Sequence, residues 1–159
     1  MADLAARRHP VVGLAAFGAA VALVAVAGSL ASMSAATEYQ ALETPSWAPP
    51  PWLFGPVWTV LYVMIAVSGW LFWKREGVRW ELGLFAAQLV LNGLWTPLFF
   101  AADLYAVALA DIVLLLASIV ALIVVFLRRG HRASGLLLVP YLLWVGFATA
   151  LNAAIVALN

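Results

Sequence analysis

Two stripes of amide and aromatic side chains follow apolar segments of this chain. In the segment QLVLNGLWTPLFF, the stripe comprises Gln88, Asn92, Trp95 and Phe99. In the segment VPYLLWVGFATALN, it comprises Tyr141, Trp144, Ala148 and Asn152. At 100° per helical residue, the first stripe covers about 60° of a helix face and the second about 80°. Each stripe is therefore expected to face one environment.

Carboxamides inside apolar helices indicate either helix–helix hydrogen bonding or a binding site. An amide facing lipid would leave a donor unsatisfied at a cost of several kcal/mol, so Gln88, Asn92 and Asn152 are expected to face other helices. Bonds between helices would contribute about 0.6 kcal/mol each. A ligand pocket instead combines apolar walls with a few convergent polar groups. Because these amides share faces with aromatic rings, we favour a pocket that also includes Trp58 and Tyr62, one turn apart on another segment.

The residues that other chemistry requires are absent or distant. The chain has no cysteine, and His9 and His131 lie at the expected inner surface, which excludes haem ligation by either residue type in the pocket. No HExxH, GxSxG, P-loop or dinucleotide-binding motif occurs. We therefore expect no required cofactor, no metal site and no nucleic-acid partner. Asp111, an acid inside an apolar segment, is expected to be structural, with a proton site of a small transporter as the alternative.

The elements that position these stripes are predicted to be membrane-spanning helices. Of 159 residues, 67% are hydrophobic and 9% are charged, whereas about 25% are charged in an ordinary soluble domain. An apolar run of about 20 residues crosses a bilayer core of ~30 Å as a helix. The sequence predicts one all-α domain over residues 1–159, a bundle of five transmembrane helices. The expected spans are about 11–30, 56–73, 80–101, 105–127 and 134–157.

The basic residues support this segmentation. All of them precede the first span or lie in alternate loops: Arg7, Arg8, Lys74, Arg75, Arg79, Arg128, Arg129 and Arg132. Short cytoplasmic loops carry the Lys and Arg excess, so we expect a cytoplasmic amino terminus and an outer carboxy terminus in a bacterial cell membrane. The Arg7–Arg8 pair followed by an apolar run also fits a cleaved secretory signal, but a run of about 20 residues exceeds the usual 7 to 15.

Residues 31–55 form the one long connection that the sequence predicts. Four prolines disfavour a regular helix there: Pro45, Pro49, Pro50 and Pro51. Three aromatic residues supply apolar surface: Trp47, Trp52 and Phe54. Because long unpatterned loops usually bind or cover something, we expect a lid over the outer mouth of the bundle. The alternative is an interfacial segment whose tryptophans lie among lipid headgroups.

Three segments together resemble the signature segments of the TspO/MBR family, the translocator proteins and tryptophan-rich sensory proteins. These segments are WAPPPWLFGPVWTVLY, QLVLNGLWTPLFF and PYLLWVGFATALN, in the family's order and spacing. The resemblance implies a five-helix protein, commonly a homodimer, with a pocket under the first loop for tetrapyrroles such as protoporphyrin IX. The pocket residues it implies are Trp47, Trp58, Asn92, Trp95, Trp144, Ala148 and Asn152. Some bacterial members degrade porphyrin in light, which implies a catalytic role for Trp58 and Trp144.

The chain departs from the family pattern in its charges. Glu38 and Thr44 stand where many relatives have Trp and Lys. The outer side then has no cation, and porphyrin carboxylates meet acids, so weak binding of the dianion is expected. The chain end AAIVALN also lacks the Tyr and Arg of the sterol-contact pattern. The predicted function is a tetrapyrrole-binding membrane receptor or sensor. The alternatives are a light-dependent porphyrin-degrading enzyme and a small proton-coupled transporter.

Overall fold

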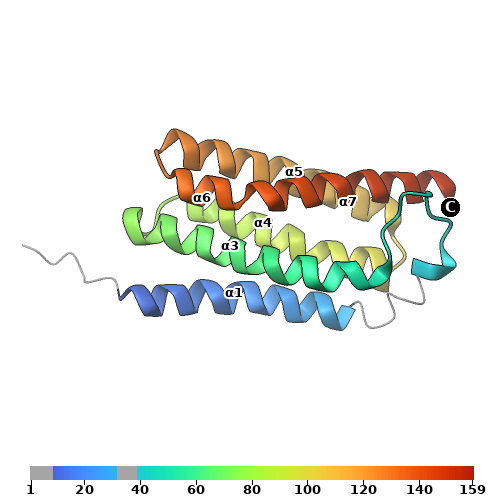
Figure 1. The fold of residues 1–159 in the computed structure, drawn as a ribbon, viewed down its shortest axis with the longest axis horizontal. Helices are drawn as coiled ribbons and strands as arrows, with labels where there is room; N and C mark the ends of the chain where they lie inside the picture. The colour runs from blue at the N-terminus through green and yellow to red at the C-terminus, as the bar shows by residue number, and fades with distance from the viewer. Residues whose placement is uncertain (1–8, 32–38) are drawn as a thin grey trace, which may run out of the picture.

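Five long apolar elements lie side by side in the computed structural model, which describes residues 9–31 and 39–159 (Figure 1). They are Pro10–Ala31, Pro51–Glu76, Glu81–Ala101, Tyr105–Arg128 and Arg132–Leu158. Each is long and apolar enough to cross a bilayer. The predicted all-helical membrane protein with five spans is confirmed.

The spans are built from eight elements among the described residues. They are α1 (Pro10–Ala31), η1 (Pro51–Leu53), α3 (Phe54–Glu76), α4 (Glu81–Thr96), η2 (Pro97–Ala101), α5 (Tyr105–Arg128), α6 (Arg132–Leu137) and α7 (Val139–Leu158). Prolines set two of the junctions. Because Pro97 lacks an amide hydrogen and crowds the preceding turn, the backbone widens from α4 into the π-helix η2. Leu138 separates α6 from α7, whose first turn contains Pro140.

The connection between the first two spans is shorter than predicted at its carboxyl end. The prolines around Pro51 were expected to exclude helix up to residue 55. Instead Pro51 begins η1, because proline is tolerated in the first turn of a helix, and α3 follows from Phe54. Residues 32–38, including Glu38, lie outside the described part of the chain. The lid over the whole of residues 31–55 therefore stays a prediction.

The helices form a closed ring in which α1 is the outermost member. α1 packs on both α3 and α4, α4 packs on α5, and α5 packs on α6 and α7, which return to α3. α3 and α4 have few direct contacts with each other, and α1 packs on both of them, so α1 covers the groove between α3 and α4.

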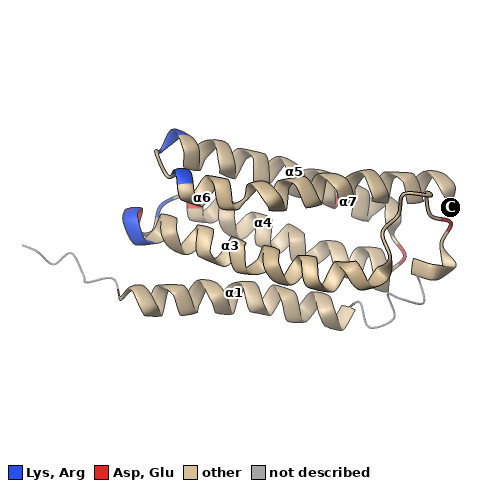
Figure 2. Cartoon of the chain, viewed as in Figure 1, with Lys and Arg blue, Asp and Glu red and all other residues tan. Residues whose placement is uncertain are grey.

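The two ends of the bundle differ in charge (Figure 2). The basic end, defined by Lys74, Arg75, Arg79, Arg128, Arg129 and Arg132, carries all Lys and Arg of the described residues. There Arg129 Nη2 lies 2.7 Å from Oε1 of the buried Glu81, and His131 Nε2 lies 3.0 Å from Glu76 Oε1. The loop end, defined by residues 39–50, the 97–104 segment and the end of α7, carries Glu43 and Asp103.

Candidate ligand-binding site

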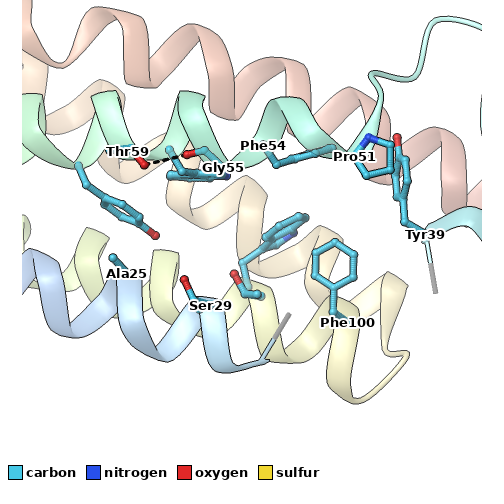
Figure 3. Close-up of a pocket in the computed structure, with 13 residues that line it drawn as sticks. Ala25, Ser29, Tyr39, Pro51, Phe54, Gly55, Thr59 and Phe100 are labelled. Carbon is cyan, nitrogen blue, oxygen red and sulfur yellow. Dashed lines mark hydrogen bonds between the residues drawn. The ribbon is translucent and has the colours of Figure 1, made fainter. Parts of the chain in front are cut away.

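A partly open cavity of about 410 Å³ lies at the loop end, in the groove that α1 covers (Figure 3). Its walls come from α1, α3, α4 and η2, with Tyr39 and Pro51 at the loop side. The lining residues are Ala25, Gly28, Ser29, Tyr39, Pro51, Phe54, Gly55, Trp58, Thr59, Tyr62, Trp95, Thr96 and Phe100.

Aromatic rings make up two facing walls of this cavity. On α3, Trp58 stacks on Tyr62 with ring centroids 5.2 Å apart and planes at 30°. On the α4 side, Trp95 stacks on Phe99 at 5.1 Å and meets Phe100 edge-on at 5.9 Å. The four-residue spacing seen in the sequence places each stacked pair one turn apart on a single continuous helical segment. The cavity therefore offers extended π surface to a flat guest.

A chain of hydrogen bonds joins the cavity wall to the core of the bundle. Tyr62 Oη donates to Asn92 Oδ1 at 3.0 Å, and Asn92 Nδ2 donates to Tyr141 Oη at 2.9 Å. Tyr141 Oη in turn donates to Gln88 Oε1 at 3.0 Å. The chain links α3, α4 and α7. It leaves Gln88 Nε2, a fully buried donor, without a partner among the described residues.

A second set of bonds fixes the indole of Trp95. Its Nε1 donates to Asn152 Oδ1 at 3.1 Å, and Asn152 Nδ2 donates to the Tyr105 carbonyl at 3.0 Å. These contacts tie α4, α7 and the start of α5 together. The amides at Asn92 and Asn152 thus serve as links between helices while they hold Tyr62 and Trp95 in the cavity wall.

The predicted ligand-binding residues gather in one region but not around one space. Trp58, Tyr62 and Trp95 line the large cavity. A neighbouring space of about 10 Å³ is lined by Asn92, Trp144 and Ala148 together with Trp58 and Trp95. A third space, also about 10 Å³, includes Trp95, Ala148 and Asn152 in its lining. Phe54, Trp58 and Trp95 line both the large cavity and the space beside Trp144, and they form the partition between those two.

Three predicted residues stand apart from the walls of these spaces. Gln88 and Tyr141 belong to the buried hydrogen-bonded chain. Trp47 is half exposed and meets Phe147 of α7 edge-on, with centroids 5.7 Å apart. Their roles in ligand binding stay predictions.

The two residues with an implied catalytic role share only the small space behind the large cavity. Trp58 lines the large cavity, whereas Trp144 lies behind it, with its ring 5.8 Å from that of Phe54. Trp144 Nε1 is buried and has no hydrogen-bond partner among the described residues. Asp111 is buried on α5, and its Oδ2 likewise has no such partner. Asp111 lines none of the three spaces.

Sequence reasoning missed the wall that α1 supplies. Ala25, Gly28 and Ser29 line the cavity, but they are small residues in a helix that is apolar on every face. No amide or aromatic residue marks which side of α1 faces inward. The one available signal was the smallness of these residues, since small side chains permit close helix approach or leave space.

The described part of the first connection contacts the start of α3 and the end of α7. Tyr39 is buried, meets Phe54 edge-on at 5.8 Å and donates from Oη to the Pro49 carbonyl at 3.4 Å. Burial raises the pKa of the Tyr39 hydroxyl above its ordinary value, so the donor stays protonated. The Glu43 amide donates to Asn159 Oδ1 at 3.1 Å, and Asn159 Nδ2 donates back to the Glu43 carbonyl at 3.0 Å. This Glu43–Asn159 clasp joins the connection to the end of α7.

These features define a multi-pass membrane protein with an aromatic cavity inside its helical bundle. Residues 16–158 match the family model described as the TspO/MBR family. The chain is 45% identical over 128 residues to the tryptophan-rich protein TspO of Chlorobaculum tepidum, which covers 76% of this chain and 78% of that relative. It is 40% identical over 146 residues to the protein of the same name in Archaeoglobus fulgidus, with 88% and 92% covered.

The similarity extends to an animal protein. The chain is 40% identical over 119 residues to the human protein named translocator protein, covering 72% of this chain and 70% of the relative. The chain therefore belongs to the TspO/MBR family. This is a family of membrane proteins whose members carry the names translocator protein and tryptophan-rich sensory protein.

Proposed function

We propose that this chain is a membrane receptor that binds a tetrapyrrole, or another flat apolar ligand, in the cavity between α1, α3 and α4. The observation that carries the proposal is the aromatic lining of a cavity of about 410 Å³. That volume lies in the usual range for small-molecule sites, roughly 300–1,000 Å³. Rings such as Trp58 and Trp95 favour offset or edge-on contact with a planar π system.

Family membership supports a role in sensing or translocation. The relative from Cereibacter sphaeroides is named tryptophan-rich sensory protein, and its match covers 76% of both chains at 38% identity. We infer that the basic end faces the cytoplasm, because short cytoplasmic loops carry Lys and Arg. The cavity then opens toward the outer side of what we take to be a bacterial cell membrane. The family resemblance further favours a homodimer.

Titration of the purified protein with protoporphyrin IX tests the proposal. We expect saturable quenching of indole fluorescence, and we expect Trp95→Ala to raise the Kd by roughly ten- to a hundredfold because a stacking wall worth about 1.5–3 kcal/mol of burial is lost. Trp52 is 71% exposed, so Trp52→Ala is the matched control and should leave the Kd unchanged. Equal effects of the two substitutions, or quenching that does not saturate, would remove the proposed site.

Trp144→Ala distinguishes the large cavity from the space behind it. Because Trp144 lies beyond the partition, a ligand confined to the large cavity should lose less affinity from this change than from Trp95→Ala. The measurement is the same titration. A larger loss in Trp144→Ala would mean that the ligand displaces the partition and occupies the inner space.

Light-dependent oxidation of a bound porphyrin is a second candidate function, and the position of Trp58 favours it. Its indole lines the cavity and is stacked on Tyr62 at 5.2 Å, so it could donate an electron to an excited porphyrin there, with dissolved O2 as the oxidant that accepts the electrons in the net reaction. Under illumination in air, porphyrin absorbance should fall faster with the native protein than with Trp58→Phe. Trp144→Phe should have the smaller effect. Equal bleaching rates in all three proteins would argue against catalysis.

A further inference from the structure

The described residues that line the large cavity include polar groups but none with a formal charge. Seven of its lining residues carry a polar side-chain group: Ser29, Tyr39, Trp58, Thr59, Tyr62, Trp95 and Thr96. None of them is Lys, Arg, His, Asp or Glu. Which ligands the cavity can bind therefore depends on which of these neutral groups already donate their hydrogens to other protein atoms.

Two hydroxyl groups of the α3 wall already donate hydrogen bonds within the protein. Tyr62 Oη donates to Asn92 Oδ1 at 3.0 Å, and Thr59 Oγ1 donates to the Gly55 carbonyl at 2.9 Å (Figure 3 draws the second bond). A hydroxyl has one proton and two lone pairs. Each oxygen can therefore still accept a hydrogen bond from a ligand, but it has no second hydrogen to donate.

Two further hydrogen bonds occupy the donors of Trp95 and Tyr39 in the same way. Trp95 Nε1 donates to Asn152 Oδ1 at 3.1 Å, and an indole nitrogen has no acceptor capacity to offer in return. Tyr39 Oη donates to the Pro49 carbonyl at 3.4 Å. Four of the seven polar groups thus donate their hydrogens to other protein atoms, and the remaining three belong to Ser29, Trp58 and Thr96.

No basic residue lies near enough along the chain to compensate. The sequence has no Lys or Arg between Arg8 and Lys74, between Arg79 and Arg128, or after Arg132. Among the described residues, the charged side chains of the loop end are Glu43 and Asp103, both acidic. A carboxylate at the cavity would therefore have no cation among the described residues of the loop end to pair with, and it would lie near two acids.

Transfer of an ionised carboxylate into such a site is unfavourable, because buried charges require a paired charge or several hydrogen-bond donors. We propose that the cavity is specific for an uncharged flat ring and discriminates against ligands that carry ionised carboxylates. This inference rests on the proposed function and narrows its ligand class. Among tetrapyrroles, an esterified or otherwise neutral ring should therefore bind more tightly than a diacid.

The test compares protoporphyrin IX with its dimethyl ester, which has the same ring without the charges. Both are titrated at neutral pH into the protein in nanodiscs of zwitterionic lipid, with indole quenching as the readout. We expect the ester to bind with a Kd lower by at least roughly tenfold, the effect of about 1.4 kcal/mol. Gly28→Phe serves as the control for partition into lipid, since its ring would fill the cavity that Gly28 lines. Saturable quenching by the ester should disappear in that variant.

A second pair of variants tests the electrostatic cause. Ser29 is exposed at the mouth of the cavity, so Ser29→Lys adds a cation there and Ser29→Gln adds a neutral side chain of similar reach. We expect the ratio of the diacid Kd to the ester Kd to be several-fold lower in Ser29→Lys than in Ser29→Gln. An unchanged ratio of diacid to ester in Ser29→Lys would contradict the electrostatic account.

The outcomes separate this inference from the proposed function. Equal Kd values for ester and diacid, or tighter binding of the diacid, overturn the charge discrimination and leave a tetrapyrrole receptor in place. Absence of saturable quenching by either compound overturns both.

Discussion

The basic end and the loop end of the same five spans are packed in different ways. At the basic end, Phe72 and Phe126 are fully buried and stack with centroids 4.5 Å apart and planes at 14°. At the loop end, the rings of Trp58, Trp95 and Phe100 surround an opening of about 410 Å³. Aromatic residues fill space at one end and enclose it at the other.

Two glycines of α3, Gly69 and Gly55, show the same contrast. A Cβ added at Gly69 would lie 2.6 Å from Phe85 Cζ and 2.7 Å from Phe17 Cε1, so the helices there approach as closely as a hydrogen permits. A Cβ at Gly55, in the cavity wall, would meet no described atom within 4 Å. The difference teaches that α3 packs closely on its neighbours near the basic end and borders open space at the cavity.

The largest effect is expected from removing a buried aromatic ring at the basic end. Phe72→Ala should lower the free energy of unfolding by about 3–5 kcal/mol, because the void has closely packed neighbours on all sides. Phe100→Ala should lower it by less than half as much, since one face of Phe100 already borders the cavity. Reversible unfolding in mixed micelles measures both. Similar losses would mean that the two ends are packed alike.

A smaller effect is expected from the glycines. Gly69→Ala should destabilise the protein by about 1–3 kcal/mol through overpacking against Phe17 and Phe85. Gly55→Ala should be neutral or stabilising by up to about 1 kcal/mol, because alanine favours the helix and nothing obstructs its methyl group. Thermal unfolding of the two variants side by side is the measurement, and a destabilised Gly55→Ala would contradict the open wall.

The smallest effect concerns the clasp between Glu43 and Asn159. Because its two bonds are exposed to solvent, Asn159→Ala should change stability by no more than about 1 kcal/mol. It should nevertheless speed hydrogen exchange of the Glu43 amide and raise the association rate of the ligand a few-fold. Unaltered exchange at Glu43 would show that the connection is held at the loop end without this clasp.

The five spans and the charge difference between the ends could be predicted, because apolar run length and the placement of Arg and Lys are properties of the sequence alone. The inward direction of the amides could also be predicted, since Gln88, Asn92 and Asn152 have no partners in lipid. Their division among two hydrogen-bonded networks could not, because it depends on how far each helix is rotated. The α1 wall escaped prediction for a related reason: a uniformly apolar helix gives no sign of which face is turned inward.

The partition formed by Phe54, Trp58 and Trp95 makes the capacity of the site depend on side-chain torsions and not on the backbone. Behind it lies a space of about 10 Å³, next to the cavity of about 410 Å³. Rotation of the Trp58 indole to another staggered conformation would join the two, whereas rotation of Trp95 would first break its hydrogen bond to Asn152. Ligands of different size would then be accommodated by side-chain rotation alone, without movement of the helices.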